Sequence, residues 1–177
     1  YNIFIVQRVI VGIDPGKKGA IAILSEDGTL LDLFDMPLTD KGKAGRVDAR
    51  LMAERLAKAM WGKCGTAVIE KVGYVPGDGG LGAFTFGEAA GVARGVVEAL
   101  GFDLVIPRPQ EWRKLHGLTG ADDHIVIQTA RLFYPKADVF TGRKKKDGSL
   151  GIKDGRTDAL LIARYGLSKN GSEQEGS

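Results

Sequence analysis

RVIVGIDPGKKG, residues 8–19, combines an apolar strand, an acidic residue and a sharp turn. The apolar run at residues 9–13 predicts a buried strand, and Pro15 prevents Asp14 from continuing into a helix. Gly16 gives the backbone the freedom that a turn needs. We therefore expect the Asp14 carboxylate to lie at a fixed place at the end of the first strand. A structural alternative is that Asp14 only hydrogen-bonds the backbone of its own turn.

The length and composition limit the class of protein. The chain of 177 residues with 44% hydrophobic content fits one soluble domain with its own core. No apolar run approaches the ~18 residues that cross a membrane, and residues 1–6 are too short for a secretory signal, so we predict a cytoplasmic protein. Cys64 is the only cysteine, which excludes an intramolecular disulfide and a thiolate zinc site within one chain.

The pattern of apolar runs predicts an α/β fold. Residues 20–24 and 29–34 are separated by Ser-Glu-Asp-Gly, a hairpin signal, so the first three strands should be antiparallel in succession. The rest predicts strands at 66–70 and 103–106 and helices at 48–61, 83–100 and 110–116. Two further helices are predicted, one from 119 or 122 to 133 and one from 154 or 155 to about 165. We place a domain at residues 8–166, an N-terminal extension at 1–7 and a disordered polar tail at 167–177.

Acidic residues recur at the ends of these elements. Glu70 ends a short apolar strand as Asp14 follows the first one, and parallel neighbouring strands would place the two side by side. Asp154 and Asp158 share one face of the last helix because they lie four positions apart. Asp158 precedes a buried apolar run and should point inward, although a hydrogen-bonded core aspartate is the alternative.

Four converging carboxylates predict a metal site. Mg²⁺ prefers carboxylate oxygens, whereas neither histidine nor the cysteine is placed for a softer metal. Two ions about 4 Å apart would clamp the attacking water and the leaving oxygen of a phosphodiester. We therefore predict catalytic and metal-binding roles, with Mg²⁺ or Mn²⁺ as cofactor, for Asp14, Glu70, Asp154 and Asp158.

Positive charge is concentrated in one segment. Residues 141–156 contain six Lys or Arg against two Asp, a net charge of +4, whereas the whole chain carries only +3. Such a block fits a surface that binds a polyanion, and a solvated mobile loop is the alternative.

Four short motifs and their order resemble the RuvC Holliday-junction resolvases of the ribonuclease H-like superfamily. The motifs are GIDPG at 12–16, VIEKV at 68–72, GEAAGV at 87–92 and TDALLIA at 157–163, so the resemblance spans about residues 8–166. It implies a ribonuclease H-like fold with a mixed five-stranded sheet flanked by helices. It also implies a homodimeric, Mg²⁺-dependent endonuclease that nicks two strands of a four-way DNA junction symmetrically. The compact, divergent pattern looks like a phage-borne member.

The resemblance assigns the first-strand Asp, the central Glu and the last helical Asp to Asp14, Glu70 and Asp158. The bacterial enzymes typically space the last two acids three apart, where this chain has Gly155, so Asp154 would act from one residue earlier. The family's aromatic wedge is replaced by Gly73, which leaves Tyr74, Phe84 or Phe86 as substitutes. Its basic residue near the penultimate helix has no direct match, and Arg113, Lys114 or His124 would serve.

The predicted DNA-binding residues are mostly cations near the acids or in the basic segment. They are Lys17, Lys18, Lys71, Tyr74, Arg113, Lys114, Arg143, Lys144, Lys145, Lys146, Lys153 and Arg156.

Three other functions stay open on the sequence. The nuclease could act on flaps, forks or RNA–DNA hybrids, or the chain could bind junctions without cleaving them. Sugar kinases and actin-like ATPases also open with an Asp-x-Gly hairpin, in which Lys17 and Lys18 would cradle a phosphate. Those proteins need a second, similar domain, for which this chain is too short. The small residues of helix 83–100 predict a dimer interface or simply close packing on the sheet.

Overall fold

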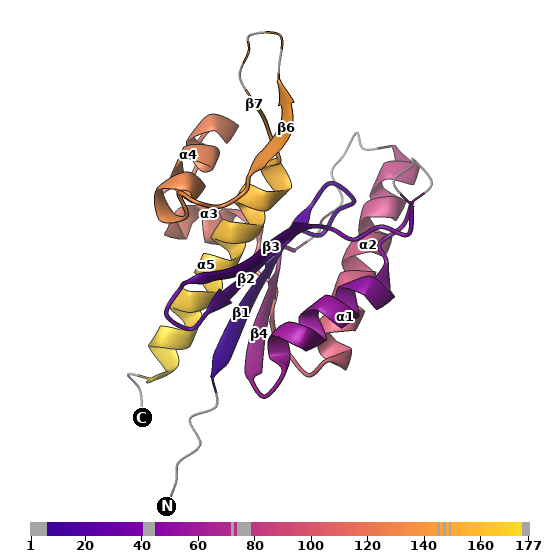
Figure 1. The fold of residues 1–177 in the computed structure, drawn as a ribbon, viewed down its shortest axis with the longest axis vertical. Helices are drawn as coiled ribbons and strands as arrows, with labels where there is room; N and C mark the ends of the chain where they lie inside the picture. Colours follow the sequence, from indigo (N-terminus) through magenta and orange to yellow (C-terminus); the bar gives the residue numbers. More distant parts are fainter. Residues whose placement is uncertain are drawn as a thin grey trace, which may run out of the picture.

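A five-stranded sheet forms the centre of the molecule (Figure 1), in the order β3-β2-β1-β4-β5. The computed structural model describes residues 7–40, 45–71, 73, 79–144, 146, 148 and 150–174. The strands are β1 (Arg8–Ile13), β2 (Ala20–Ser25), β3 (Leu30–Asp35), β4 (Cys64–Ile69) and β5 (Asp103–Val105). β2 is antiparallel to β1 and to β3, whereas β4 is parallel to β1 and to β5. The predicted mixed sheet with three antiparallel strands is confirmed.

Helices cover both faces of the sheet (Figure 1). α1 (Ala49–Met60) and α2 (Gly80–Ala99) lie on one face, and α3 (Pro109–Leu115), α4 (Asp123–Phe133) and α5 (Asp154–Gln174) lie on the other. The period of two along β1 explains the two cores, because Val9 and Val11 pack with α1 and α2 while Ile10 packs with α5. Asp48 caps α1 as predicted, accepting a 3.0 Å hydrogen bond from the Leu51 amide.

α5 lies directly against β1. Gly12 has no side chain, and a Cβ at this position would overlap backbone atoms of Ala159 and Ala163. Residues 159–163 of the helix are fully buried as a result. This close approach brings the first turn of α5 to the turn that follows β1.

The basic segment contains two strands that the sequence did not predict. β6 (Phe140–Lys144) and β7 (Leu150–Ile152) form an antiparallel hairpin that extends away from the sheet, at the top of Figure 1. Phe140 pairs with Ile152 at its base, and Gly148 takes the positive φ of 82° that a tight reversal requires. These few apolar positions flank a run of lysines, so the sequence shows no clear strand pattern there.

The end of the chain also differs from the prediction. α5 continues to Gln174, so residues 167–174 are helical and not a disordered tail. A helix with a buried first half extends into polar sequence at little cost, because each further residue adds one backbone hydrogen bond. Residues 1–6 of the predicted extension lie outside the described residues. No helix in the described part of the chain has the length and apolar character to span a membrane.

Candidate active site

Asp14 and Glu70 follow two neighbouring parallel strands. Ile13 of β1 is in register with Ile69 of β4, and the Glu70 amide donates a 3.3 Å hydrogen bond to the Ile13 carbonyl. The two acids therefore occupy equivalent positions at the carboxyl ends of their strands, as the sequence predicts. Burial raises the pKa of Asp14 to about 7, and the negative charge of Glu70 contributes to the rise.

Asp158 faces the same place from α5. Burial raises its pKa to about 7, and the charges of Asp14, Glu70 and Asp154 act in the same direction. Asp154, one turn earlier at the start of the helix, is exposed. The three half-buried carboxylates and the exposed one thus form one electrostatically coupled cluster.

Gly155 marks the contact between α5 and the turn after β1. A Cβ at this position would lie 2.5 Å from the Lys18 carbonyl oxygen and 3.0 Å from Oδ2 of Asp14. No carboxylate-bearing side chain fits there in this arrangement. The acid at the start of α5 is therefore Asp154, which explains why the spacing to Asp158 is four and not three.

Glu70 has a partner that sequence reasoning alone does not find. Nε1 of Trp112 in α3 donates a 2.8 Å hydrogen bond to Oε1 of Glu70, and Trp112 is fully buried. Burial nevertheless raises the pKa of Glu70, against the lowering by this hydrogen bond and by the charge of Arg113. The same Arg113 charge also opposes the rise in the pKa of Asp158. A tryptophan in a short polar helix signals burial, but nothing local identifies its partner.

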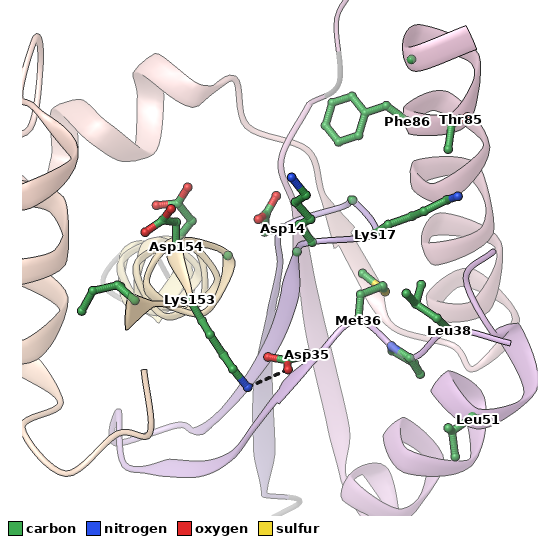
Figure 2. A pocket seen from close by; sticks show the side chains of 18 of the residues that line it. Asp14, Lys17, Asp35, Met36, Leu38, Leu51, Thr85, Phe86, Lys153 and Asp154 are labelled. Atoms are coloured by element: carbon green, nitrogen blue, oxygen red, sulfur yellow. Dashed lines mark hydrogen bonds and ion pairs between the residues drawn. The ribbon is translucent and has the colours of Figure 1, made fainter. Parts of the chain in front are cut away.

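A cleft of about 1350 Å³ lies in front of the acids, between α2 and the start of α5. Figure 2 shows Asp14 and Asp154 on one side and Phe86 and Thr85 of α2 on the other. Lys17 and Lys18, in the turn after Asp14, also line it. The cleft is therefore lined by carboxylates, by two lysines and by apolar side chains of α2.

The other predicted DNA contacts are spread over three surfaces. Lys71 and Lys114 are exposed and Arg113 is half-buried near the acids, while Arg143 and Lys146 are exposed on the hairpin. Tyr74, Lys145 and the side chain of Lys144 lie outside the described residues. Phe84 is 71% exposed on α2, and Phe86 contacts the turn at Gly16, so both aromatic substitutes lie on the helix that lines the cleft.

The structure does not support a DNA contact for Arg156. Arg156 is 9% exposed, and its guanidinium donates to the carboxylates of Asp35 (2.6 Å) and Asp138 (2.8 Å). Lys153 also pairs with Asp35, at 2.8 Å, as the dashed line in Figure 2 shows. Burial alone would raise the pKa of Asp35, but the hydrogen bonds from Arg156 and Lys153 lower it below the usual range. These pairs join the first turn of α5 to β3 and to the base of the hairpin.

The acids fit a hard divalent cation by their chemistry. Among the described residues, no group of three His, Cys, Asp or Glu side chains is arranged to hold an ion as it stands. The donors are nevertheless all carboxylates, and no ion pair within that part of the chain involves Asp14, Glu70, Asp154 or Asp158. Half-buried negative charges without a cation favour Mg²⁺ or Mn²⁺, although the carboxylates must draw closer to enclose it.

The strand order and the helices on both faces of the sheet correspond to a ribonuclease H-like α/β fold. Among solved structures, the chain is similar to RuvC of Thermus thermophilus, with 15% identity and a TM-score of 0.59 over 93% of this chain and 96% of that one. It is also similar to T. thermophilus RuvC in complex with a Holliday junction substrate, with 13% identity and a TM-score of 0.55 at the same coverage. No protein-family model and no curated protein matches the sequence. The predicted resemblance to RuvC is confirmed as a likeness of fold.

Proposed function

We propose that this protein is a Mg²⁺-dependent endonuclease that resolves four-way DNA junctions by symmetric paired nicks. The observation that carries the proposal is that Asp14 and Glu70 follow neighbouring parallel strands and that Asp158 of α5 interacts electrostatically with both. Asp14 and Asp158 also line one cleft. The complex of T. thermophilus RuvC with a Holliday junction substrate supports branched DNA as the ligand of this fold.

The carboxylates are the groups that would hold the metal. Asp14, Glu70 and Asp158, with Asp154 from the helix start, supply the oxygen ligands. When bound, Mg²⁺ polarises the scissile phosphate and lowers the pKa of a water molecule, which is the chemistry that phosphodiester hydrolysis needs. Burial disfavours the charged form of Asp14 and Asp158. A bound cation would therefore stabilise both carboxylates in their charged form.

Cations on both sides of the acids would hold the DNA backbone. Lys17 and Lys18 line the cleft directly beside Asp14. The hairpin adds Arg143 and Lys146, which are exposed. Cations so placed neutralise phosphates without reading the base sequence, in keeping with selection by DNA shape.

α2 supplies the proposed dimer interface. Gly87, Gly91 and Gly95 repeat at one face of the helix, and a Cβ at each would meet no atom within 4 Å. This face is therefore directed away from the core, and Leu81 and Phe84 next to it are 80% and 71% exposed. A second copy would cover this surface and bring the second active site that paired nicks require.

The dimer can be tested separately from catalysis. G91R places a long charged side chain in the middle of the glycine face and should convert a dimer into a monomer at micromolar concentration in sedimentation experiments. G117R is unsuitable as a control, because Gly117 has a φ of +69° and an arginine there would strain the backbone. G87A adds only one methyl group to the glycine face and is the milder comparison. A wild-type chain that is monomeric at this concentration contradicts the interface.

The cleavage test compares DNA structures. A labelled four-way junction should be cut at paired positions with Mg²⁺ or Mn²⁺, and duplex, flap and RNA–DNA hybrid substrates should be cut much more slowly. Without metal the junction should be bound and not cut. Equal cleavage of flaps or hybrids would show that four-way junctions are not the preferred substrate. Metal-independent binding without cleavage under any condition would indicate a junction-binding protein that is not a nuclease.

A further inference from the structure

Trp112 is the only side chain in the described part of the chain with a hydrogen bond to the Glu70 carboxylate. The bond joins residues 42 positions apart in the sequence, at 2.8 Å, and brings α3 to the end of β4. Trp112 has no exposed surface. A fully buried indole that donates to a half-buried carboxylate is a specific arrangement, since both groups lose water on folding.

The chemistry of the indole fixes the orientation of Glu70. An indole N–H is only a donor, so it binds a carboxylate oxygen and cannot accept a proton from it. The bond engages Oε1 and leaves Oε2 for other partners. The glutamate side chain has three rotatable bonds, and ordering it costs conformational entropy that this hydrogen bond offsets in advance of any ligand.

α3 is stabilised at both ends by hydrogen bonds within its own segment. The Arg108 amide donates a 2.6 Å hydrogen bond to the Glu111 carboxylate at the start of the helix, and the Leu118 amide donates to the Arg113 carbonyl beyond its end. The ring packs in the core cluster that includes Val68 of β4 and Leu161 of α5. Burial in this cluster therefore fixes the indole relative to β4 and α5, two of the three elements that position the acids.

We propose that Trp112 is a positioning residue of the metal centre, whose indole N–H holds Glu70 so that the remaining carboxylate oxygen is presented to a divalent cation. The inference rests on the metal site of the proposed function. It adds to that function a residue that supports a ligand without contacting the metal, a role in which substitution typically costs about 10–100-fold in metal affinity or activity.

The two tryptophans of the chain give a direct test in the unaltered protein. Trp61 is 88% exposed at the end of α1, whereas Trp112 is buried. In ¹⁵N-labelled protein the two indole N–H signals can be assigned with W61F. Addition of Mg²⁺ should shift the Trp112 signal in a saturable way and leave the Trp61 signal unchanged, and E70Q should abolish the shift.

The second test compares the same substitution at the two sites. W112F keeps a buried ring and removes the donor, while W61F makes this change on the surface. Mn²⁺ affinity, measured by electron paramagnetic resonance, should fall about 10–100-fold in W112F and stay unchanged in W61F. Junction cleavage by W112F should be slow at limiting Mn²⁺ and recover in excess, because the loss lies in holding the metal.

The outcomes separate the positioning role from the proposed function. Metal binding with no response of the Trp112 signal, or wild-type Mn²⁺ affinity in folded W112F, overturns the role of Trp112 and leaves the nuclease proposal intact. A saturable Trp112 shift in a protein that cuts no DNA supports the positioning role and rejects the nuclease. A protein that binds no Mg²⁺ or Mn²⁺ rejects both. If W112F does not fold, the signals of the unaltered protein decide.

Discussion

The acidic centre and the basic hairpin both adjoin the start of α5 and are built in opposite ways. Asp14, Glu70 and Asp158 are half-buried, repel one another and have raised pKa values. Arg143 and Lys146 are exposed and stand on a hairpin that extends from the domain. The comparison shows that charge held inside the fold reduces stability, whereas exposed charge on the hairpin affects stability little. Under the proposed function the acids would hold the metal and the hairpin would bind DNA.

The largest expected effect comes from removing one buried acid. D14N should lower the rate of metal-dependent junction cleavage by at least about 1,000-fold, because losing a metal ligand removes several kcal/mol of transition-state stabilisation and 1.36 kcal/mol is a factor of ten. Gel-shift affinity for the junction should stay close to that of the wild type. Cleavage by D14N at more than a few per cent of the wild-type rate would remove Asp14 from the metal site.

The hairpin should show the reverse pattern, a loss of binding without a loss of chemistry. Replacing Arg143, Lys144, Lys145 and Lys146 by alanine should weaken junction binding roughly tenfold or more at low salt, and each lost phosphate contact should flatten the log–log salt dependence by about 0.9. Single-turnover cleavage at saturating protein should change little.

The control for the hairpin variant removes cations from another surface. R50A/K58A changes two positive side chains on α1, on the opposite side of the sheet from the hairpin. Its salt slope should equal that of the wild type. If the hairpin variant keeps the wild-type slope as well, the hairpin faces solvent in the complex and the comparison fails on that side.

A smaller effect concerns stability without metal. Since the folded-state pKa values of Asp14 and Asp158 are about 7, above the ordinary aspartate value of 3.8, the folded protein binds more protons than the unfolded chain between these limits. The free energy of unfolding should therefore fall as the pH rises from about 4 through 7. Calorimetry at pH 5 and pH 8 should show the lower melting temperature at pH 8, and saturating Mg²⁺ should reduce the difference.

The same argument predicts that neutral variants are more stable. D158N should raise the metal-free melting temperature at pH 8 by a few °C, since about 1 kcal/mol corresponds to roughly 2–4 °C in a domain of this size. E26Q, at an exposed acid in the turn between β2 and β3, should leave it unchanged. A metal-free D158N that melts below the wild type would indicate that Asp158 is a hydrogen-bonded core residue.

The sequence was sufficient where local patterns carried the information. Apolar runs and turn residues located β1 to β4. The acids at the ends of two of these strands predicted that Asp14 lies beside Glu70 if the strands are parallel neighbours, as β1 and β4 are. Asp158 was identified because a charged residue next to a buried apolar run of a helix is costly unless it has a partner or a ligand. Each of these inferences depends on residues within one element or its immediate neighbour.

The failures involve partners that are distant in sequence. Arg156 belongs to a cationic segment, and only the folded chain shows that Asp35 and Asp138 neutralise it. The bond from Trp112 to Glu70 has no local signature for the same reason. The hairpin was missed because its pairing rests on a few apolar residues, such as Phe140 and Ile152, in a lysine-rich stretch.

The contact of α5 with Gly12 has an evolutionary consequence. Backbone touches backbone at this point, so the distance between the helix and β1 does not depend on the size of the surrounding core side chains. Those side chains can be substituted extensively while the helix stays packed against the strand. A chain that shares only 15% of its residues with T. thermophilus RuvC can therefore have the same architecture, and mutational tolerance should be low at this glycine.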